Sequence, residues 1–423
     1  MRNHNSRRSF ISQAAIAATL SPLSIFGQGY ERAIDRIPKV SSPSSLKITA
    51  VKCGYIRGSL FVKIYTNQDI WGCGEAVDAV AGTYYLVKIL GARIEGQSPL
   101  NVHRLFEDIR KSGFFQGAQS GMYVAVLSAI ETALWDLAGK ALGLPVYQLL
   151  GGKFRDKVRV YCDTALYQYN LPTATDFAEA ALDAKKMGFN AIKFDLDQAN
   201  DPNKYDRYNW TANAAELQRM YDQLAAARQA VGPNIDICAD MHGRYDAVTA
   251  HAIAKRLEPL NLMWLEEPVP AENIEVYKLI ADSTTTPICV GENQYLAYGF
   301  RRMLEIGAVD IVMPDLQKCG GLGEGQRIAN LANLYYIPFA PHMVASFLGA
   351  MASVHVCAAV PNFMILEWQR YFHSQPMFRE IVSYDGEWVK KGYITVSEKP
   401  GIGVEINESG MKKYAVPGMP FFE

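Results

Sequence analysis

Three carboxylates recur at a fixed interval in the second half of the chain. Asp240, Glu266 and Glu292 are each 26 residues apart (266 − 240 and 292 − 266), and each closely follows a short apolar run. If each interval holds one strand and one helix, the three side chains come from adjacent strands and face one another. Such carboxylates repel unless a divalent cation lies between them. Ligation by oxygen alone favours Mg²⁺, with Mn²⁺ as the alternative.

A candidate acid/base pair follows the same pattern further along. His342 ends the run "IPFAPH", and Asp315, 27 residues earlier (342 − 315), ends "VDIVMPD". An aspartate on the adjacent strand can orient the imidazole and raise its basicity, so His342 is a candidate general base. Neighbouring strand residues point to opposite faces, so Glu267 is expected to cap a helix or form an ion pair rather than share the site of Glu266.

The elements that must position these side chains can be read from periodicity. From Lys157 onward, eight short apolar runs alternate with helical stretches, from "VRVYCDTA" to "NFMILEW". This rhythm predicts an α/β fold with a (β/α)8-type barrel over residues 157–385, in which the C-terminal ends of the strands converge on one mouth. A doubly wound open sheet is the alternative, but no phosphate-binding glycine loop follows the first strand.

A different unit precedes the barrel. Residues 46–156 begin with apolar runs broken by Gly and by "TNQD", which predict antiparallel strands, and they become helical from about Tyr84. Strands followed by helices are typical of a separate α+β domain.

The first 45 residues have the layout of an exported protein. The stretch "NSRRSFISQAAIAATLSPLSIFG" joins Arg7 and Arg8 to a modest apolar run and resembles a twin-arginine signal over residues 1–29. Residues 30–45, rich in Ser and Pro, are expected to form a linker. The expected location is therefore periplasmic, or otherwise outside the cytoplasm by the twin-arginine route.

Charge and cysteine content narrow the partners. Lys and Arg number 42 against 43 Asp and Glu, which gives no electrostatic reason to expect nucleic acid, or a membrane beyond the export signal. The seven cysteines contain no CxxC pair and suggest neither a disulfide framework nor a zinc cluster. A small-molecule carboxylate is the expected partner, and the expected assembly is a homo-oligomer.

Several motifs together carry a family resemblance. The stretches "GCGEA", "CADMHG", "WLEEPV", "VGEN", "MPDLQKCGG" and "APHM" occur in this order. They resemble the enolase superfamily in its mandelate racemase-like subgroup. The resemblance implies a capping domain built from the N-terminal region and the C-terminal segment 386–423. It also implies an enolate anion stabilised by Mg²⁺ on the three carboxylates, and a cap region Tyr55 to Ser59 that closes on substrate.

One departure from the family pattern concerns the second base. The family often carries K-x-K at the end of the second barrel strand, whereas this chain has "IKFDLD". Lys193 matches the first lysine and is placed to pair with a substrate carboxylate, and Asp195 replaces the second. Asp195 could bind a hydroxyl or hold Lys193, and a structural ion pair is an equal alternative. Racemisation needs a base on each face of the carbon, so this replacement disfavours it.

His242 indicates which reaction the site performs. Strand alternation places it on the same face as Asp240. The stretch Asp-x-His-Gly-Arg resembles galactonate and mannonate dehydratases, in which the histidine is the acid that helps the 3-hydroxyl leave. A role beside the metal or in a turn is the alternative. Arg244 is expected to be a loop or carboxylate-pairing residue.

The remaining predicted contacts surround the substrate. Glu367 in "ILEW" matches a family position whose glutamic acid donates a hydrogen bond to the substrate carboxylate. Asn293 follows a metal-ligand position, and it either lines the pocket or caps a loop. Tyr55 is the candidate contact from the cap.

The predicted function is that of a Mg²⁺-dependent dehydratase, a hydro-lyase, acting on an aldonate-like sugar acid. His342 removes the C2 proton through an enediolate, and elimination of the 3-hydroxyl gives a 2-keto-3-deoxy acid. One alternative is an epimerase, racemase or cycloisomerase on the same scaffold. Another is a sugar-acid binding protein without turnover. A metallohydrolase is disfavoured because the first strand has no H-x-H pair.

Overall fold

The computed structural model describes residues 45–164, 166, 169–198, 201, 202, 204, 206, 208 and 210–423. The predicted export signal, residues 1–29, and residues 30–44 of the predicted linker lie outside the described part of the chain.

The cap begins with an antiparallel sheet of three strands in the order β1-β2-β3. A set of helices follows this sheet. The strands are β1 (Ile48–Ile56), β2 (Ser59–Thr66) and β3 (Trp71–Ala76), and the helices are α2 (Tyr84–Ala92), α3 (Val102–Ser112), α4 (Gly121–Leu142) and α5 (Val146–Leu149), with 3-10 turns at Ala81–Thr83 and Phe114–Gln116. Strands first and helices second is the order that the sequence predicts.

Helix α4 is the centre of the cap. It is apolar on nearly all sides, which is typical of a helix buried in a core, and it packs against β3. Glycines of β3 make this close approach possible, because a Cβ at Gly74 would lie 2.0 Å from the backbone oxygen of Ala129. Helix α4 is also the one described helix that is long and apolar enough to cross a membrane, and it lies inside the fold.

The barrel consists of parallel strands in sequence order. The order β10-β4-β5-β6-β7-β8-β9 places each strand beside its successor in the sequence and brings the last strand back to the first. The strands are β4 (Lys157–Asp163), β5 (Ala191–Asp195), β6 (Asp236–Asp240), β7 (Trp264–Glu266), β8 (Ile288–Val290), β9 (Ile311–Val312) and β10 (Leu366–Gln369). Phe339 bridges Val312 on one side and Phe363 on the other, so the run "IPFAPH" closes the ring. The structure confirms the predicted barrel.

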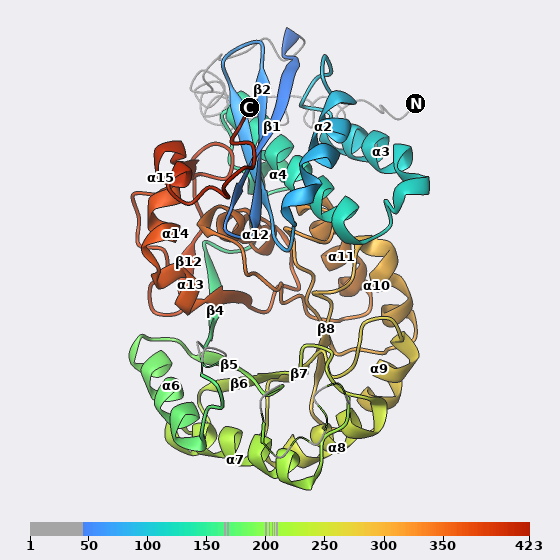
Figure 1. Ribbon diagram of the computed structural model, residues 1–423, viewed down its shortest axis with the longest axis vertical. Helices are drawn as coiled ribbons and strands as arrows, with labels where there is room; N and C mark the ends of the chain where they lie inside the picture. The colour runs from blue at the N-terminus through green and yellow to red at the C-terminus, as the bar shows by residue number, and fades with distance from the viewer. Residues whose placement is uncertain are drawn as a thin grey trace, which may run out of the picture. The chain divides into compact units, whose positions relative to one another are not determined.

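Helices connect successive strands of the barrel (Figure 1). They are α6 (Ala174–Lys186), α7 (Ala214–Val231), α8 (Ala247–Leu257), α9 (Ile274–Ala281), α10 (Leu296–Glu305), α11 (Leu322–Leu334) and α12 (Phe347–Ala359), with a 3-10 turn at Glu258–Leu260. Two of them begin with a full capping box. Thr173 with Asp176 starts α6, and Asn213 with Glu216 starts α7, so the side chains satisfy free N–H groups at each start.

The end of the chain contacts both parts of the fold. It contains α13 (Arg370–Ser374), α14 (Pro376–Ile381), β11 (Val382–Ser383), β12 (Tyr393–Thr395), β13 (Glu405–Ile406) and α15 (Glu408–Lys412). Strand β12 pairs with barrel strand β4, whereas Val416 and Phe422 donate backbone hydrogen bonds to Tyr55 and Cys53 of β1. Figure 1 shows this last segment, in dark red, beside the blue cap strands. The segment 386–423 therefore pairs with β1 only through its final residues.

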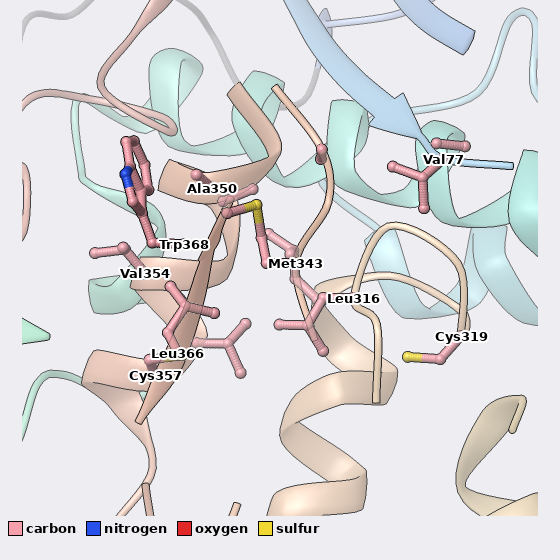
Figure 2. Packing of buried hydrophobic residues seen from close by; sticks show 14 of the residues in the cluster. Val77, Leu316, Cys319, Met343, Ala350, Val354, Cys357, Leu366 and Trp368 are labelled. Atoms are coloured by element: carbon pink, nitrogen blue, oxygen red, sulfur yellow. The ribbon is translucent and has the colours of Figure 1, made fainter. Parts of the chain in front are cut away.

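One continuous apolar core joins the cap and the barrel. Figure 2 shows side chains of α12, such as Ala350 and Val354, with Leu366 and Trp368 of β10. Val77, just past cap strand β3, belongs to the same buried cluster. The two parts therefore share apolar packing.

Buried carboxylates of the cap also hold the starts of two barrel helices. Glu75 of β3 accepts hydrogen bonds from the backbone N–H of Ser346 at 2.9 Å and of Gly349 at 3.3 Å, at the start of α12. Glu131 of α4 accepts from Leu322 at 2.7 Å and Gly323 at 2.8 Å, at the start of α11. A helix start presents free N–H groups and a positive dipole end, so an anion there is stabilising.

We predict that Glu75→Ala lowers the free energy of unfolding by about 3 kcal/mol, because buried N–H donors of α12 lose their acceptor. Equilibrium urea unfolding measures the change. The matched control is Glu95→Ala, an exposed acid of the cap, which should change the same quantity by no more than about 0.5 kcal/mol. Equal effects of the two substitutions would show that Glu75 does not hold the helix.

Candidate active site

The predicted site residues lie at the C-terminal ends of neighbouring barrel strands. Asp195 pairs in register with Asp240, and Asp240 pairs with Glu266, on β5, β6 and β7. Glu292 and Asp315 come just after β8 and β9. Parallel strands carry these carboxylates to one end of the barrel. Seven of the carboxylates at this end are buried, namely Asp163, Asp240, Glu266, Glu267, Glu292, Asp315 and Glu367.

Lys193 is the central cation of this cluster. Its Nζ lies 3.0 Å from Asp240 Oδ2, 3.0 Å from Glu266 Oε1 and 2.9 Å from Glu367 Oε1. Burial alone would lower the pKa of Lys193, but Glu266 and Glu367 raise it well above its usual value. Lys193 is therefore an ammonium that ties three carboxylates together, and among the ion pairs of the described residues its partners do not include Asp195.

His342 is held between carboxylates on both ring nitrogens. Nδ1 lies 2.7 Å from Asp315 Oδ2, and Nε2 lies 2.8 Å from Glu292 Oε2. Burial would lower the pKa of His342, but Glu367 and Glu292 raise it well above its usual value, together with the bond to Asp315. Asp315 thus fixes Nδ1, and Nε2 points into the cluster.

A turn after strand β6, and not strand alternation, places His242 beside the cluster. Strand β6 ends at Asp240, and His242 has a left-handed backbone with φ +45°. Its backbone N–H donates to Asp240 Oδ1 at 2.9 Å, and its Nε2 lies 3.6 Å from Asp240 Oδ2. The expectation that His242 lies on the side of Asp240 agrees with this geometry, but a turn produces it and strand pleating does not.

Asp197 orients His242, although it is not among the site residues that the sequence predicts. Its Oδ1 lies 2.9 Å from His242 Nδ1. Asp240 first of all, and then the bond to Asp197, raise the pKa of His242 well above its usual value. Arg244 Nε lies 3.5 Å from Asp197 Oδ2 and its side chain is 67% exposed, so Arg244 pairs with a carboxylate. The signal for Asp197 was present, because "KFDLD" places acidic residues at alternate positions after Lys193.

Asp195 and Glu267 sit at the edge of the cluster. Burial raises the pKa of each to about 7. Glu267 accepts hydrogen bonds from the backbone N–H of Gly291 at 3.2 Å and from Asn293 Nδ2 at 3.0 Å. Glu267 therefore has a structural role in supporting the loop after β8, but among the described residues it does so through these hydrogen bonds and not as the expected helix cap or ion-pair partner.

Asn293 connects this loop to the cap. Its Nδ2 lies 3.0 Å from Glu292 Oε1, and its Oδ1 accepts from Lys318 Nζ at 3.2 Å. Lys318 in turn pairs with Asp78 of the cap at 2.9 Å. A substrate contact by Asn293 stays a prediction.

A cavity of about 790 Å³ opens beside His242. Its lining comes from barrel loops and from the cap: Arg110, Gln119, Ser120, His242, Gly243, Glu267, Pro270, Ala271, Glu272, Asn293, Gln294, Tyr295, Leu296, Tyr298 and Gly299. The cap contributes residues around the start of α4, whereas the hydroxyl of Tyr55 is buried and lies 2.5 Å from Thr83 Oγ1. Tyr55 as a substrate contact stays a prediction.

Two overlapping sets of side chains could hold a divalent metal. The ligand atoms of Asp195, Asp240 and His242 lie within 4.8 Å of one another, and this is the one such group among the described residues. The predicted trio of Asp240, Glu266 and Glu292 shares only Asp240 with it. Both sets supply carboxylate oxygens. The first set adds a ring nitrogen of His242, whereas the predicted trio supplies oxygens alone.

The charge balance of the cluster fits a divalent cation. Among the described residues, the ion-pair partners of the seven buried carboxylates are Lys193, His242 and His342. Burial raises the pKa of Glu266, and the charge of Asp240 raises it further, so these two neighbours repel. His342 lowers the pKa of Glu292 to about 2 against the effect of burial. Sharing the charge of Glu292 with a cation would release His342 from this ion pair and lower its pKa toward the range of a base.

Comparison with known proteins identifies the family. Residues 35–151 match the mandelate racemase / muconate lactonizing enzyme N-terminal domain, and residues 176–410 match the enolase C-terminal domain-like family. The chain belongs to the enolase superfamily. A solved mandelate racemase/muconate lactonizing enzyme-like protein from Rubrobacter xylanophilus matches with a TM-score of 0.85 and 41% identity, over 89% of this chain and 99% of that one.

Two relatives within the enolase superfamily are named for the loss of water. A D-xylonate dehydratase of Haloferax volcanii is 38% identical over 89% of this chain and 91% of its own length. A D-galactonate dehydratase of Xanthomonas oryzae pv. oryzae is 31% identical over 84% of this chain and 90% of its own length. The chain is therefore an enzyme of the hydro-lyase class within this superfamily, whose members use a divalent metal.

We predict that removal of divalent metal lowers the thermal stability of the protein, because the carboxylate cluster then lacks its balancing charge. Mg²⁺ added back at a hundredfold excess over its Kd should restore about 2.7 kcal/mol. Differential scanning fluorimetry after EDTA dialysis reads this shift in Tm. Asp240→Asn should abolish the shift. Glu272→Gln, which changes an exposed acid in the lining of the cavity beside His242, should keep it. A shift that survives Asp240→Asn would contradict the assignment.

Proposed function

We propose that this protein is a Mg²⁺-dependent dehydratase of an aldonate-like sugar acid. Its reaction would remove the C2 proton and the 3-hydroxyl to give a 2-keto-3-deoxy acid. One observation carries the proposal: two histidines, each held by its own aspartate, approach the same carboxylate cluster. They are His342 with Asp315 and His242 with Asp197. Dehydration needs a base and an acid, and this arrangement provides one of each.

His342 is the proposed base. Asp315 bonds to Nδ1, so the imidazole is fixed with Nε2 directed into the cluster. A base held in this way accepts the C2 proton without first having to reorient. The proton of a carbon next to a carboxylate is very weakly acidic, so the charge that develops on the carboxylate must be stabilised as the proton leaves.

Lys193 is placed to meet that charge. It is buried at the centre of the cluster, 2.9 Å from Glu367. Burial strengthens its electrostatic interaction with a substrate carboxylate, because little water competes for it. Glu367 would contribute only in its protonated form, as a hydrogen-bond donor to the same carboxylate. Asp240, Glu266 and Glu292 would hold the Mg²⁺, or Mn²⁺ in its place. When bound, the metal would supply electrophilic stabilisation of the same developing charge.

His242 is the proposed acid. The carboxylates of Asp240 and Asp197 favour its protonated form, so it enters the reaction carrying the proton that it must give away. Hydroxide is a poor leaving group, and a proton donated to the 3-hydroxyl lets it depart as water. Its side chain is 37% exposed, which lets the proton be replaced from solvent.

The rival reactions have less support from the geometry. Epimerisation needs a second base opposite His342, and Lys193 is the family position nearest to that role. Lys193 is held by three carboxylates at 2.9 to 3.0 Å, and it matches the first lysine of the family motif, whereas Asp195 replaces the second lysine, which supplies the base. A binding protein without turnover would have no need for two oriented histidines.

The proposed reaction predicts a definite product. Purified protein with Mg²⁺ and a library of sugar acids should release 2-keto-3-deoxy acids, detected as semicarbazones. His342→Asn, which removes the base, should lower the rate by at least a thousandfold. Recovery of an epimer without any keto acid would instead support the rival reaction.

Replacing each histidine in turn should separate the two steps of the reaction, proton exchange at C2 and loss of water. His242→Asn should abolish loss of water and keep exchange of the C2 proton with deuterium from solvent, because His342 still acts. Proton NMR of the sugar acid in D₂O measures this exchange. In His342→Asn both exchange and dehydration should be lost. If exchange also vanished in His242→Asn, the division of roles would be wrong.

A further inference from the structure

The cavity beside His242 is larger than the proposed reaction requires. Its volume of about 790 Å³ lies in the upper part of the range for pockets that hold drug-sized ligands. A five- or six-carbon acid is far smaller, and its reacting end belongs among the buried carboxylates. The cavity therefore has room for a further part of the substrate.

His242 links the reacting end to the cavity. It contacts Asp240 within the carboxylate cluster and also lines the cavity. If its proton goes to the oxygen on C3, the substrate runs past His242 with C1 and C2 toward Lys193 and His342. The carbons beyond C3 then continue into the cavity.

The lining of the cavity suits a sugar ring. Tyr298 is 68% exposed, and the guanidinium of Arg110 lies 5.6 Å from the centre of its ring, so the ring is supported from the cap side. Ser120 provides a hydroxyl beside it, and Gln119 and Gln294 provide amide oxygens, since their Nε2 atoms donate to the backbone oxygens of Phe114 at 3.1 Å and Ala271 at 2.8 Å. An aromatic face can cover the C–H face of a sugar, while amides and hydroxyls both donate to and accept from its hydroxyl groups.

We propose that this cavity is a subsite for a glycosyl group, and that the substrates include sugar acids glycosylated at C4 or beyond. The inference rests on the proposed dehydratase function. A sugar on O4 leaves the C2 proton and the 3-hydroxyl free, so the elimination can proceed unchanged. The C2–H bond breaks with transfer of the proton to His342, the C2=C3 bond forms, and the C3–O bond breaks as His242 protonates the oxygen. The enol of the product then becomes the 2-keto-3-deoxy acid, with the glycosidic bond intact.

Matched pairs of acids test the subsite. Each pair shares its configuration at C2 and C3: xylonate with xylobionate, gluconate with cellobionate, and galactonate with its 4-O-galactosyl derivative. Formation of 2-keto acid gives kcat/KM for each acid. For every aldonate that the enzyme accepts, the glycosylated partner should react with at least equal kcat/KM.

Substitutions in the cavity wall test whether the cavity causes the preference for the glycosylated acid. Tyr298→Ala removes the aromatic face, and Ala271→Trp fills the cavity from the opposite loop. Each should lower the ratio of kcat/KM, glycosylated over plain acid, by tenfold or more. The control is Tyr336→Ala. Tyr336 is 95% exposed and lies between α11 and the bridging residue Phe339, at the end of the barrel away from the site, so the ratio should not change.

The outcomes separate this inference from the function on which it rests. Turnover of an aldonate without turnover of its glycosylated partner would overturn the subsite and leave the dehydratase standing. A ratio that stays constant in both Tyr298→Ala and Ala271→Trp would also overturn it. If no sugar acid of either kind yields a 2-keto acid, the proposed function fails and the subsite fails with it.

Discussion

The ion pairs of Lys193 are the interaction on which the site depends. One ammonium contacts Asp240, Glu266 and Glu367 from three strands of the barrel, and all four groups are buried. Buried charges are costly unless they are paired. Among the described residues, the mouth holds seven buried carboxyl groups, and their cationic partners are Lys193, His242 and His342. This arrangement suits a divalent cation and a protonated His242.

The cap also contains paired buried carboxylates, at a distance from the mouth of the barrel. Glu75 and Glu131 are buried carboxylates whose partners are backbone N–H groups at the starts of α12 and α11. Gly321 has φ +95°, and a Cβ there would lie 2.1 Å from Glu131 Oε2, so the "CGG" stretch lets the backbone approach. These contacts fix the end of the loop after β9, which carries Asp315, and the segment that directly follows His342. Cap and barrel are therefore held in register close to the proposed base.

The sequence predicted what depends on periodicity, and it missed what depends on turns. Eight apolar runs were enough for the barrel, because strand ends in a barrel converge whatever the loops do. Spacing also indicated Asp315 as the partner of His342. Asp197 was missed because it lies beyond β5, and its contact with His242 depends on the positive φ of that residue. The cavity beside His242 was missed too, because its lining residues, among them Arg110, Gln119 and Tyr298, come from loops and helix surfaces without a shared sequence pattern.

In the proposed mechanism, oxygen ligands alone hold the metal and leave His242 free as an acid. An anomalous difference map from crystals soaked in Mn²⁺ tests it most directly, because such a map locates the metal by its own signal. We expect one peak between Asp240, Glu266 and Glu292, with the imidazole of His242 still bonded to Asp197. A peak between Asp195, Asp240 and His242 would contradict it, since a histidine that binds the metal cannot protonate a leaving hydroxyl.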